Sequence, residues 1–177
     1  MPKFFHEILR RYVEVPESPE RVVSLYPSIT DAIVLLGAED RLVGISSWCP
    51  VYVKGIRKPV VGSPTQANLE RLKSADPDLV FTTTGIQRSV SEELAKAGFS
   101  VIPIPTPKTV YGILDNLVVI GSLLGLGDRA RKLAAQISRE MSQMGIEPPR
   151  GSVYVEIWPG KYSITAGALS FITDYLR

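Results

Sequence analysis

Short apolar runs alternate with amphipathic stretches along the first hundred residues. Three stretches, at 28–36, 68–75 and 89–97, carry apolar residues at helical spacing and are followed by glycine or proline. The runs between and around them are short and rich in apolar or β-branched residues, as buried strands are. These runs are residues 21–25, 42–45, 59–62, 78–82 and 100–104. The alternation predicts an α/β lobe with a mostly parallel sheet and helices on both faces, because crossovers between parallel strands are right-handed.

Capping signals are expected at three of the helix starts. Ser28 is placed to accept from the free amides of the first turn, as in a capping box with Asp31 as its acid. Ser89 or Ser91 is expected to cap the helix that stops before Gly98. Asp128 is expected to cap a later helix. Residues 11–15 alternate between polar and apolar and predict an edge strand.

The second half of the chain departs from the βα alternation. Residues 109–124 and 128–144 have the spacing of two successive helices, interrupted by LGLG at 124–127. A strand is expected at 152–157, and a helix begins at 171. Two long helices without a strand between them indicate two lobes joined by a helix. We therefore predict an N-terminal α/β lobe (1–108), a helical spacer (109–150) and the start of a second lobe (151–177).

Composition limits the classes of function. The 177 residues are 45% hydrophobic and carry a net charge of +2 with scattered Lys and Arg, which gives no electrostatic footprint for nucleic acid. The single cysteine, Cys49, cannot form an intrachain disulfide. The N-terminal residues lack the apolar core of a secretory signal, so no export signal is expected in the chain as written. The longest apolar stretch, residues 117–126, is much shorter than the roughly 20 residues that cross a bilayer.

Catalytic and metal-binding patterns are weak. The only histidine is His6, so no Ser, His and Asp set is available. Cys49 has no metal-ligating partner at useful spacing and is expected to be a small buried residue. Gly125 and Gly127 do not follow a strand, so they predict a helix break and not a phosphate loop. We expect no catalysis, no cofactor and no metal site. A tetrapyrrole metal chelatase remains an alternative by analogy of fold alone.

Several motifs occur together in a family-specific order. They are RYVEVP at 11–16, PERVVSL at 19–25, PSITD at 27–31, NLE at 68–70, PDLV at 77–80 and YVEIW at 154–158. From about residue 11 to 177 the chain resembles the substrate-binding proteins of ABC importers for vitamin B12, ferric siderophores and haem. The resemblance implies two α/β lobes joined by a rigid backbone helix, here residues 128–144. It also implies a metal chelate in the cleft between the lobes, and an ABC permease as partner.

The second lobe is expected to be incomplete. Only residues 151–177 follow the helical spacer, whereas the two lobes of the family are similar in size. The chain is then either a fragment of a longer product or a shortened relative, such as an intracellular carrier or interaction module derived from a receptor. Residues 151–177 are expected to pack on the first lobe, to pair with another copy in a homodimer, or to stay poorly ordered. The resemblance implies an extracytoplasmic location, while the missing signal leaves a cytoplasmic one open.

The resemblance assigns ligand contacts in the first lobe. Trp48 matches an aromatic position that contacts the flat face of the ligand, and Ser47 lies in the same strand-end loop. Packing of Trp48 over Pro50 or Val51 is the alternative. Thr83 and Thr84 stand where the B12-binding branch has an aromatic residue, and their hydroxyls suit a more polar ligand.

Three further residues are assigned by resemblance. Glu156 and Trp158 match a segment that faces the cleft, with an edge-strand charge and a core aromatic as the alternatives. Glu70 matches an acidic residue that docks onto arginines of the permease, with a solvated helix charge as the alternative. Pro64 stands where the B12-binding branch has a second aromatic residue. The resemblance therefore does not decide whether the chelate is cobalamin, haem or a ferric siderophore.

Overall fold

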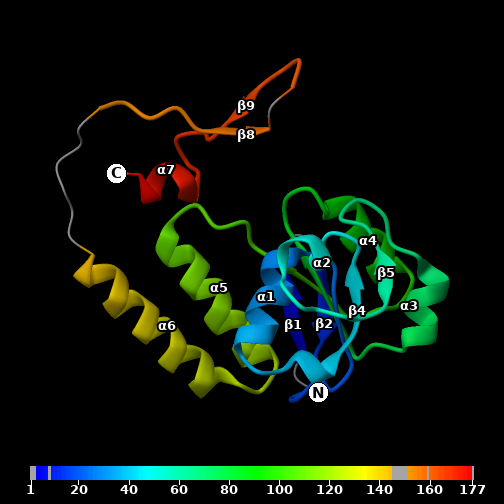
Figure 1. Cartoon of the computed structure of the whole chain (residues 1–177). Helices are drawn as coiled ribbons and strands as arrows, with labels where there is room; N and C mark the ends of the chain where they lie inside the picture. Colours follow the sequence, from blue (N-terminus) through cyan, green and yellow to red (C-terminus); the bar gives the residue numbers. More distant parts are fainter. Residues whose placement is uncertain (1–2, 8, 145–150, 159, 177) are drawn as a thin grey trace.

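The structure is a computed structural model, which describes residues 3–7, 9–144, 151–158 and 160–176 (Figure 1). Its centre is a five-stranded parallel sheet in the order β5-β4-β3-β6-β7. The strands are β3 (Val22–Ser24), β4 (Leu42–Ser46), β5 (Val60–Gly62), β6 (Leu79–Thr83) and β7 (Val101–Ile104). Every residue of β3, β6 and β7 is buried, as expected for parallel strands that are covered on both faces. The predicted α/β class is confirmed.

Helices cover both faces of this sheet. One face carries α1 (Pro27–Leu35), α5 (Val110–Leu123) and α6 (Gly127–Gln143), and the other carries α3 (Leu69–Ala75) and α4 (Arg88–Lys96) (Figure 1). Successive side chains of β3 point to opposite faces of the sheet, so they pack into two different core clusters. Val22 packs into the cluster with α1 and α5, and its neighbour Val23 packs into the cluster with α3 and α4.

The α5 and α6 helices form a close hairpin beside the sheet. A Cβ at Gly121 of α5 would overlap that of Ala130 in α6, so the two backbones approach closely only because position 121 has no side chain. The α6 helix matches the predicted helix at 128–144 to within one residue at either end. Leu133 and Ile137 of α6 pack against the core. Figure 1 shows α6 running alongside α5. The boundaries at 108 and 150 stay predictions, and the second lies outside the described residues.

The N-terminal segment differs from the prediction. The expected strand at 11–15 is β2 (Arg11–Glu14), but it pairs antiparallel with β1 (Lys3–His6) and not with the central sheet. Two bonds fasten this hairpin to the lobe. Arg11 Nη1 donates to Ala95 O at 2.6 Å, and Ser100 Oγ donates to Glu14 O at 2.8 Å. The predicted edge strand is therefore present, in a two-stranded sheet whose partner β1 was not predicted.

The predicted helix caps were wrong. The α1 helix starts at Pro27 with Tyr26 at the N-cap position, so Ser28 lies inside the first turn. Proline favours the first helical position because its φ is already near the helical value, which moves the start ahead of Ser28. The α4 helix starts at Arg88 after Gln87, so Ser89 and Ser91 lie within it. In the same way Asp128 lies inside the first turn of α6.

The described part of the C-terminal region is small. It contains an antiparallel hairpin, β8 (Glu156–Trp158) with β9 (Ile164–Thr165), and the helix α7 (Phe171–Tyr175). The predicted strand at 152–157 is thus shorter and starts later. The α7 helix packs on α5, and Asp174 Oδ2 accepts from Val110 N at 2.8 Å. None of the helices in the described ranges is long and apolar enough to span a bilayer.

Candidate functional site

The sheet order reverses between β3 and β6. From β3 the sheet extends through β4 to β5 on one side, and from β6 it extends to β7 on the other. Open parallel sheets bind ligands at the carboxyl ends of the strands where the order reverses. The segments that leave these ends begin with Leu25 and Tyr26 after β3, and with Thr84 after β6. The topology therefore places the candidate site at this edge.

A largely apolar hollow of about 600 Å³ opens at this edge. Its volume is within the range of small-molecule pockets, roughly 300–1,000 Å³. It lies between α1, the ends of β6 and β7, and the helices α5, α6 and α7. Its lining includes Tyr26, Ser28, Ile29, Asp31, Leu35, Thr83, Ile86, Ile104, Ile113, Leu117, Ile137 and Phe171.

An aromatic hollow of about 380 Å³ adjoins the larger one. Tyr26, Trp48 and Tyr52 line it, together with Asp31, and the two hollows share Tyr26, Ser28 and Asp31. A one-turn helix, α2 (Cys49–Tyr52), places Tyr52 one turn after Trp48. Their ring centroids are 6.4 Å apart at 57°, and the two residues are 42% and 67% exposed. Trp48 therefore neighbours Tyr52 and stays half open to solvent.

The Gln87 side chain joins the loops beneath this site. It is fully buried, and its Nε2 donates to Leu25 O and to Pro64 O, both at 2.9 Å. Its Oε1 accepts from Thr83 N at 2.9 Å. One amide thus satisfies three backbone groups where β3, β5 and β6 end. An unmet buried group costs about 1–3 kcal/mol, so Gln87 fixes the spacing of the loops.

A buried cluster of hydroxyl and thiol groups holds the Trp48 loop. Cys49 Sγ lies 3.1 Å from Thr30 Oγ1 and 3.2 Å from Ser46 Oγ. Thr30 Oγ1 donates to Ser24 Oγ at 2.8 Å. Cys49 is buried, as predicted, but it is hydrogen-bonded and not simply apolar. The cluster ties β3, β4 and α1 to the residue that follows Trp48.

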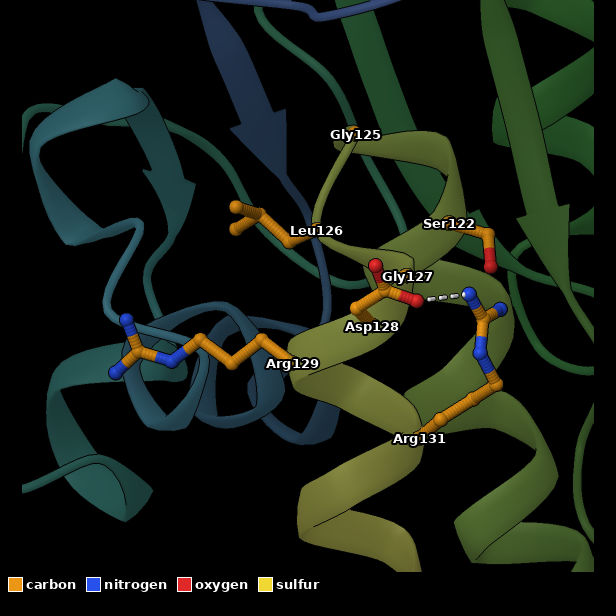
Figure 2. Close-up of a pocket in the computed structure, with 7 residues that line it drawn as sticks. All are labelled: Ser122, Gly125, Leu126, Gly127, Asp128, Arg129 and Arg131. Carbon is orange, nitrogen blue, oxygen red and sulfur yellow. Dashed lines mark hydrogen bonds and ion pairs between the residues drawn. The ribbon is translucent and has the colours of Figure 1, made fainter.

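A third hollow, of about 550 Å³, lies at the turn between α5 and α6 (Figure 2). Figure 2 shows Arg129 and Arg131 directed away from each other. Arg131 Nη2 donates to Asp128 Oδ1 at 2.6 Å. The Arg129 guanidinium lies against Gly37, which has a φ of +66° and follows α1. Both arginines thus have structural contacts, and they do not converge on a ligand position.

The predicted residues of the first lobe gather at the sheet edge. Thr83 is 7% exposed, lines the larger hollow, and has its Oγ1 3.4 Å from Thr106 Oγ1. Thr84 Oγ1 accepts from Thr106 N at 3.2 Å, outside both hollows. Ser47 is exposed beside Trp48, and its amide donates to Gly62 O at 2.8 Å. The structure brings Trp48 and Thr83 to one continuous surface, and contact with a ligand stays a prediction for all four.

Comparison with known proteins decides the family. The family described as "Periplasmic binding protein" matches residues 22–155 of this chain. The chain belongs to the periplasmic binding protein family. Its candidate site lies at the carboxyl edge of the parallel sheet, where the aromatic hollow opens.

Individual relatives within this binding protein family are distant. A "Cobalamin-binding protein" of Halobacterium salinarum is 28% identical over 167 residues, covering 90% of this chain and 44% of the relative. An uncharacterized ABC transporter substrate-binding lipoprotein of Bacillus subtilis, YvrC, is 23% identical over 174 residues, covering 93% and 55%. The chain spans about half the length of the curated relatives it matches.

Solved structures agree in fold. A possible iron-binding, periplasmic solute-binding protein of Staphylococcus epidermidis has a TM-score of 0.74 at 23% identity, covering 90% of this chain and 64% of that one. The periplasmic heme-binding protein RhuT of Roseiflexus sp. RS-1 has a TM-score of 0.69 at 24% identity, covering 88% and 62%. The periplasmic binding protein fold is therefore shared.

The remaining predicted residues lie elsewhere in this binding protein. Glu156 is exposed on β8, in a hairpin that Figure 1 shows standing apart from the sheet. Trp158 ends β8, but its side chain lies outside the described part of the structure. Glu70 is exposed in the first turn of α3, where the helix dipole favours a carboxylate. Glu70 lines neither hollow at the sheet edge and lies beside Pro59 and Val60 at the start of β5.

Sequence reasoning missed three residues at the site. Tyr26 follows β3 as Trp48 follows β4, so the strand-end argument that selected Trp48 applied equally to it. Tyr52 required the short helix α2, which the loop composition did not indicate. Gln87 had no local signal, because its three partners come from separate loops.

Replacement of Gln87 by leucine is expected to lower the free energy of unfolding by roughly 2–4 kcal/mol, because two carbonyls and one amide lose their buried partner. Urea unfolding followed by circular dichroism measures the change. Gln136→Leu is the matched control, because Gln136 is exposed and bonds only to Glu140 on its own helix. Equal stability of the two variants would contradict the assigned role of Gln87.

Proposed function

We propose that this chain supplies the first lobe and bridging helix of a solute receptor for an ABC importer, which binds a metal chelate of the cobalamin, haem or ferric siderophore class without catalysis. The observation that carries the proposal is the wall of Tyr26, Trp48 and Tyr52 beside the apolar hollow at the sheet edge. Aromatic rings supply large flat contact areas for planar ligands. The half-open Trp48 suits stacking more than core packing.

Names of relatives support this ligand class. A matching protein of Halobacterium salinarum is named for cobalamin, and one of Vibrio cholerae for vitamin B12. Structures of similar fold include heme-binding and petrobactin-binding proteins. These names agree in one respect, that the bound solute is a chelate of a metal or a metal-binding compound.

Each predicted residue has a role in this proposal. Trp48 stacks on the ligand, and Ser47, Thr83 and Thr84 offer polar groups at the rim. The second lobe contributes Glu156 and Trp158 from the opposite side of a cleft. The stacking role of Trp48, on which the other roles depend, is open to test by ligand titration.

A permease contact at Glu70 is part of the proposal. Its carboxylate is exposed in the first turn of α3, outside both hollows. Glu70→Lys is expected to weaken binding to membranes that contain the permease and its ATPase by at least tenfold, because the charge is reversed, while chelate affinity stays unchanged. Co-sedimentation measures the first and equilibrium dialysis the second. Glu93→Lys, an exposed reversal on α4, is the control, and an equal loss in both variants would contradict a specific contact.

A second copy of the chain is the proposed partner of residues 151–177. Apolar side chains on and beside the β8–β9 hairpin are exposed: Val153, Tyr154, Ile157, Ile164 and Leu169. Burial of apolar area favours association by about 25 cal/mol per Å². Sedimentation velocity is expected to show a concentration-dependent dimer that the double variant Ile157→Ser, Ile164→Ser converts to monomer. Tyr12→Ser is the control, and monomers alone at every concentration would contradict the dimer.

Ligand binding is tested with cobalamin, haemin and ferric hydroxamate and catecholate chelates. The tryptophan fluorescence of the unaltered chain is followed, and Trp48→Phe, which leaves Trp158 as the only tryptophan, shows how much of the quenching reports on the proposed wall. We expect saturable quenching by one chelate class, after correction for ligand absorption with free tryptophan amide. Quenching by none of them would contradict the receptor function for this chain.

The contribution of Trp48 is tested separately by equilibrium dialysis. Trp48→Ala is expected to weaken binding about tenfold, because it removes a stacking surface worth roughly 1–2 kcal/mol. Tyr12→Ala is the matched control, since Tyr12 is a similarly exposed aromatic on β2, in the separate N-terminal hairpin. Affinity that is unchanged by Trp48→Ala would place the ligand elsewhere.

A further inference from the structure

The described lining of the two hollows at the sheet edge contains a negative charge and no positive charge. Among the described residues that line them, Asp31 is the only one with a charged side chain. Asp31 is exposed on α1, and it belongs to none of the ion pairs in the described ranges. A carboxylate without a cationic partner repels an anion and attracts a cation at the same position. The lining thus favours a positive group over a negative one.

The aromatic residues of the hollow also favour a positively charged group. The face of an aromatic ring is electronegative and attracts a cation within about 6 Å of the ring centroid. Tyr26, Trp48 and Tyr52 reach the hollow from the segment after β3, the segment after β4, and the end of α2. The Trp48 and Tyr52 rings are inclined by 57° at 6.4 Å, so they form a corner and not a closed stack. A compact cation in this corner would contact more than one ring.

A purely structural role explains these side chains less well. A residue whose only role is to cover the core would be expected to have its ring mostly buried, yet Trp48 is 42% and Tyr52 67% exposed. Asp31 gains little from the helix dipole beyond the first turn of α1, which begins at Pro27. Three aromatic side chains and one carboxylate converge on about 380 Å³ with no positive charge in the lining.

We propose that the aromatic hollow is a subsite for an organic cation of the alkylammonium type, held by Tyr26, Trp48 and Tyr52 and by the charge of Asp31. The subsite goes beyond the proposed receptor function, because it defines the charge of the bound group whichever chelate carries that group. It also predicts that an isolated alkylammonium compound binds without any chelate.

Choline and 3,3-dimethyl-1-butanol provide a matched pair of probes, because they share shape and differ in charge. With Trp48 as the sole tryptophan in Trp158→Phe, choline is expected to give a saturable fluorescence change at millimolar concentration. The neutral alcohol is expected to bind at least tenfold more weakly. Raising the salt concentration to half molar should weaken choline binding and leave the alcohol unaffected.

Asp31→Asn, made in the same background, is expected to weaken choline at least fivefold without changing the affinity for the neutral alcohol. Asp40→Asn is the control, since Asp40 is an exposed aspartate that lies outside both hollows. Equal binding of the two probes, no saturable response to choline, or an unchanged affinity in Asp31→Asn would each overturn the cation subsite. Choline binding without binding of any chelate would retain the subsite and refute the receptor function. Chelate binding together with equal affinity for choline and the neutral alcohol would retain the receptor function and refute the cation subsite.

Discussion

The site depends on one buried amide. Where β3, β5 and β6 end, three buried backbone groups would have no partner without a side chain that reaches them. Gln87 meets all three, with bonds to Leu25 O, Pro64 O and Thr83 N at 2.9 Å. Tyr26 follows directly on Leu25, and Thr83 lines the larger hollow. The geometry of the candidate site is therefore fixed from beneath, by a side chain that does not line either hollow.

A second buried group fixes the other half of the wall. Cys49, Thr30, Ser46 and Ser24 satisfy one another between β3, β4 and α1. Ser24 Oγ in turn donates to Tyr26 O at 3.2 Å, which links the cluster to the residue that starts the wall. Polar networks that are fully satisfied in a low-dielectric interior are rigid. The polar groups of Gln87 and of the Cys49 cluster are thus buried below the site, and the aromatic rings lie at its surface.

The sequence predicted those features that depend on local pattern. Buried strands were found because their β-branched runs need no partner to be recognised, and α6 was predicted within a residue at each end because its apolar positions repeat over four turns. Ser28 failed as a cap because the preceding Pro27 starts the helix first. Tyr52 and Gln87 were missed for a different reason. Their positions follow from contacts between segments far apart in the chain, and neither residue type carries a local signal for such contacts.

The contacts that hold the aromatic wall come from one part of the chain. The supports of the wall are Gln87 and the cluster around Cys49, and both lie between residues 24 and 87. The larger hollow differs, because Phe171 of α7 lines it and Asp174 fastens α7 to the start of α5. Changes in residues 151–177 should therefore alter the apolar hollow while leaving the wall in place. The arrangement of the rings and of Asp31 is then separable from the contribution of α7 to the larger hollow.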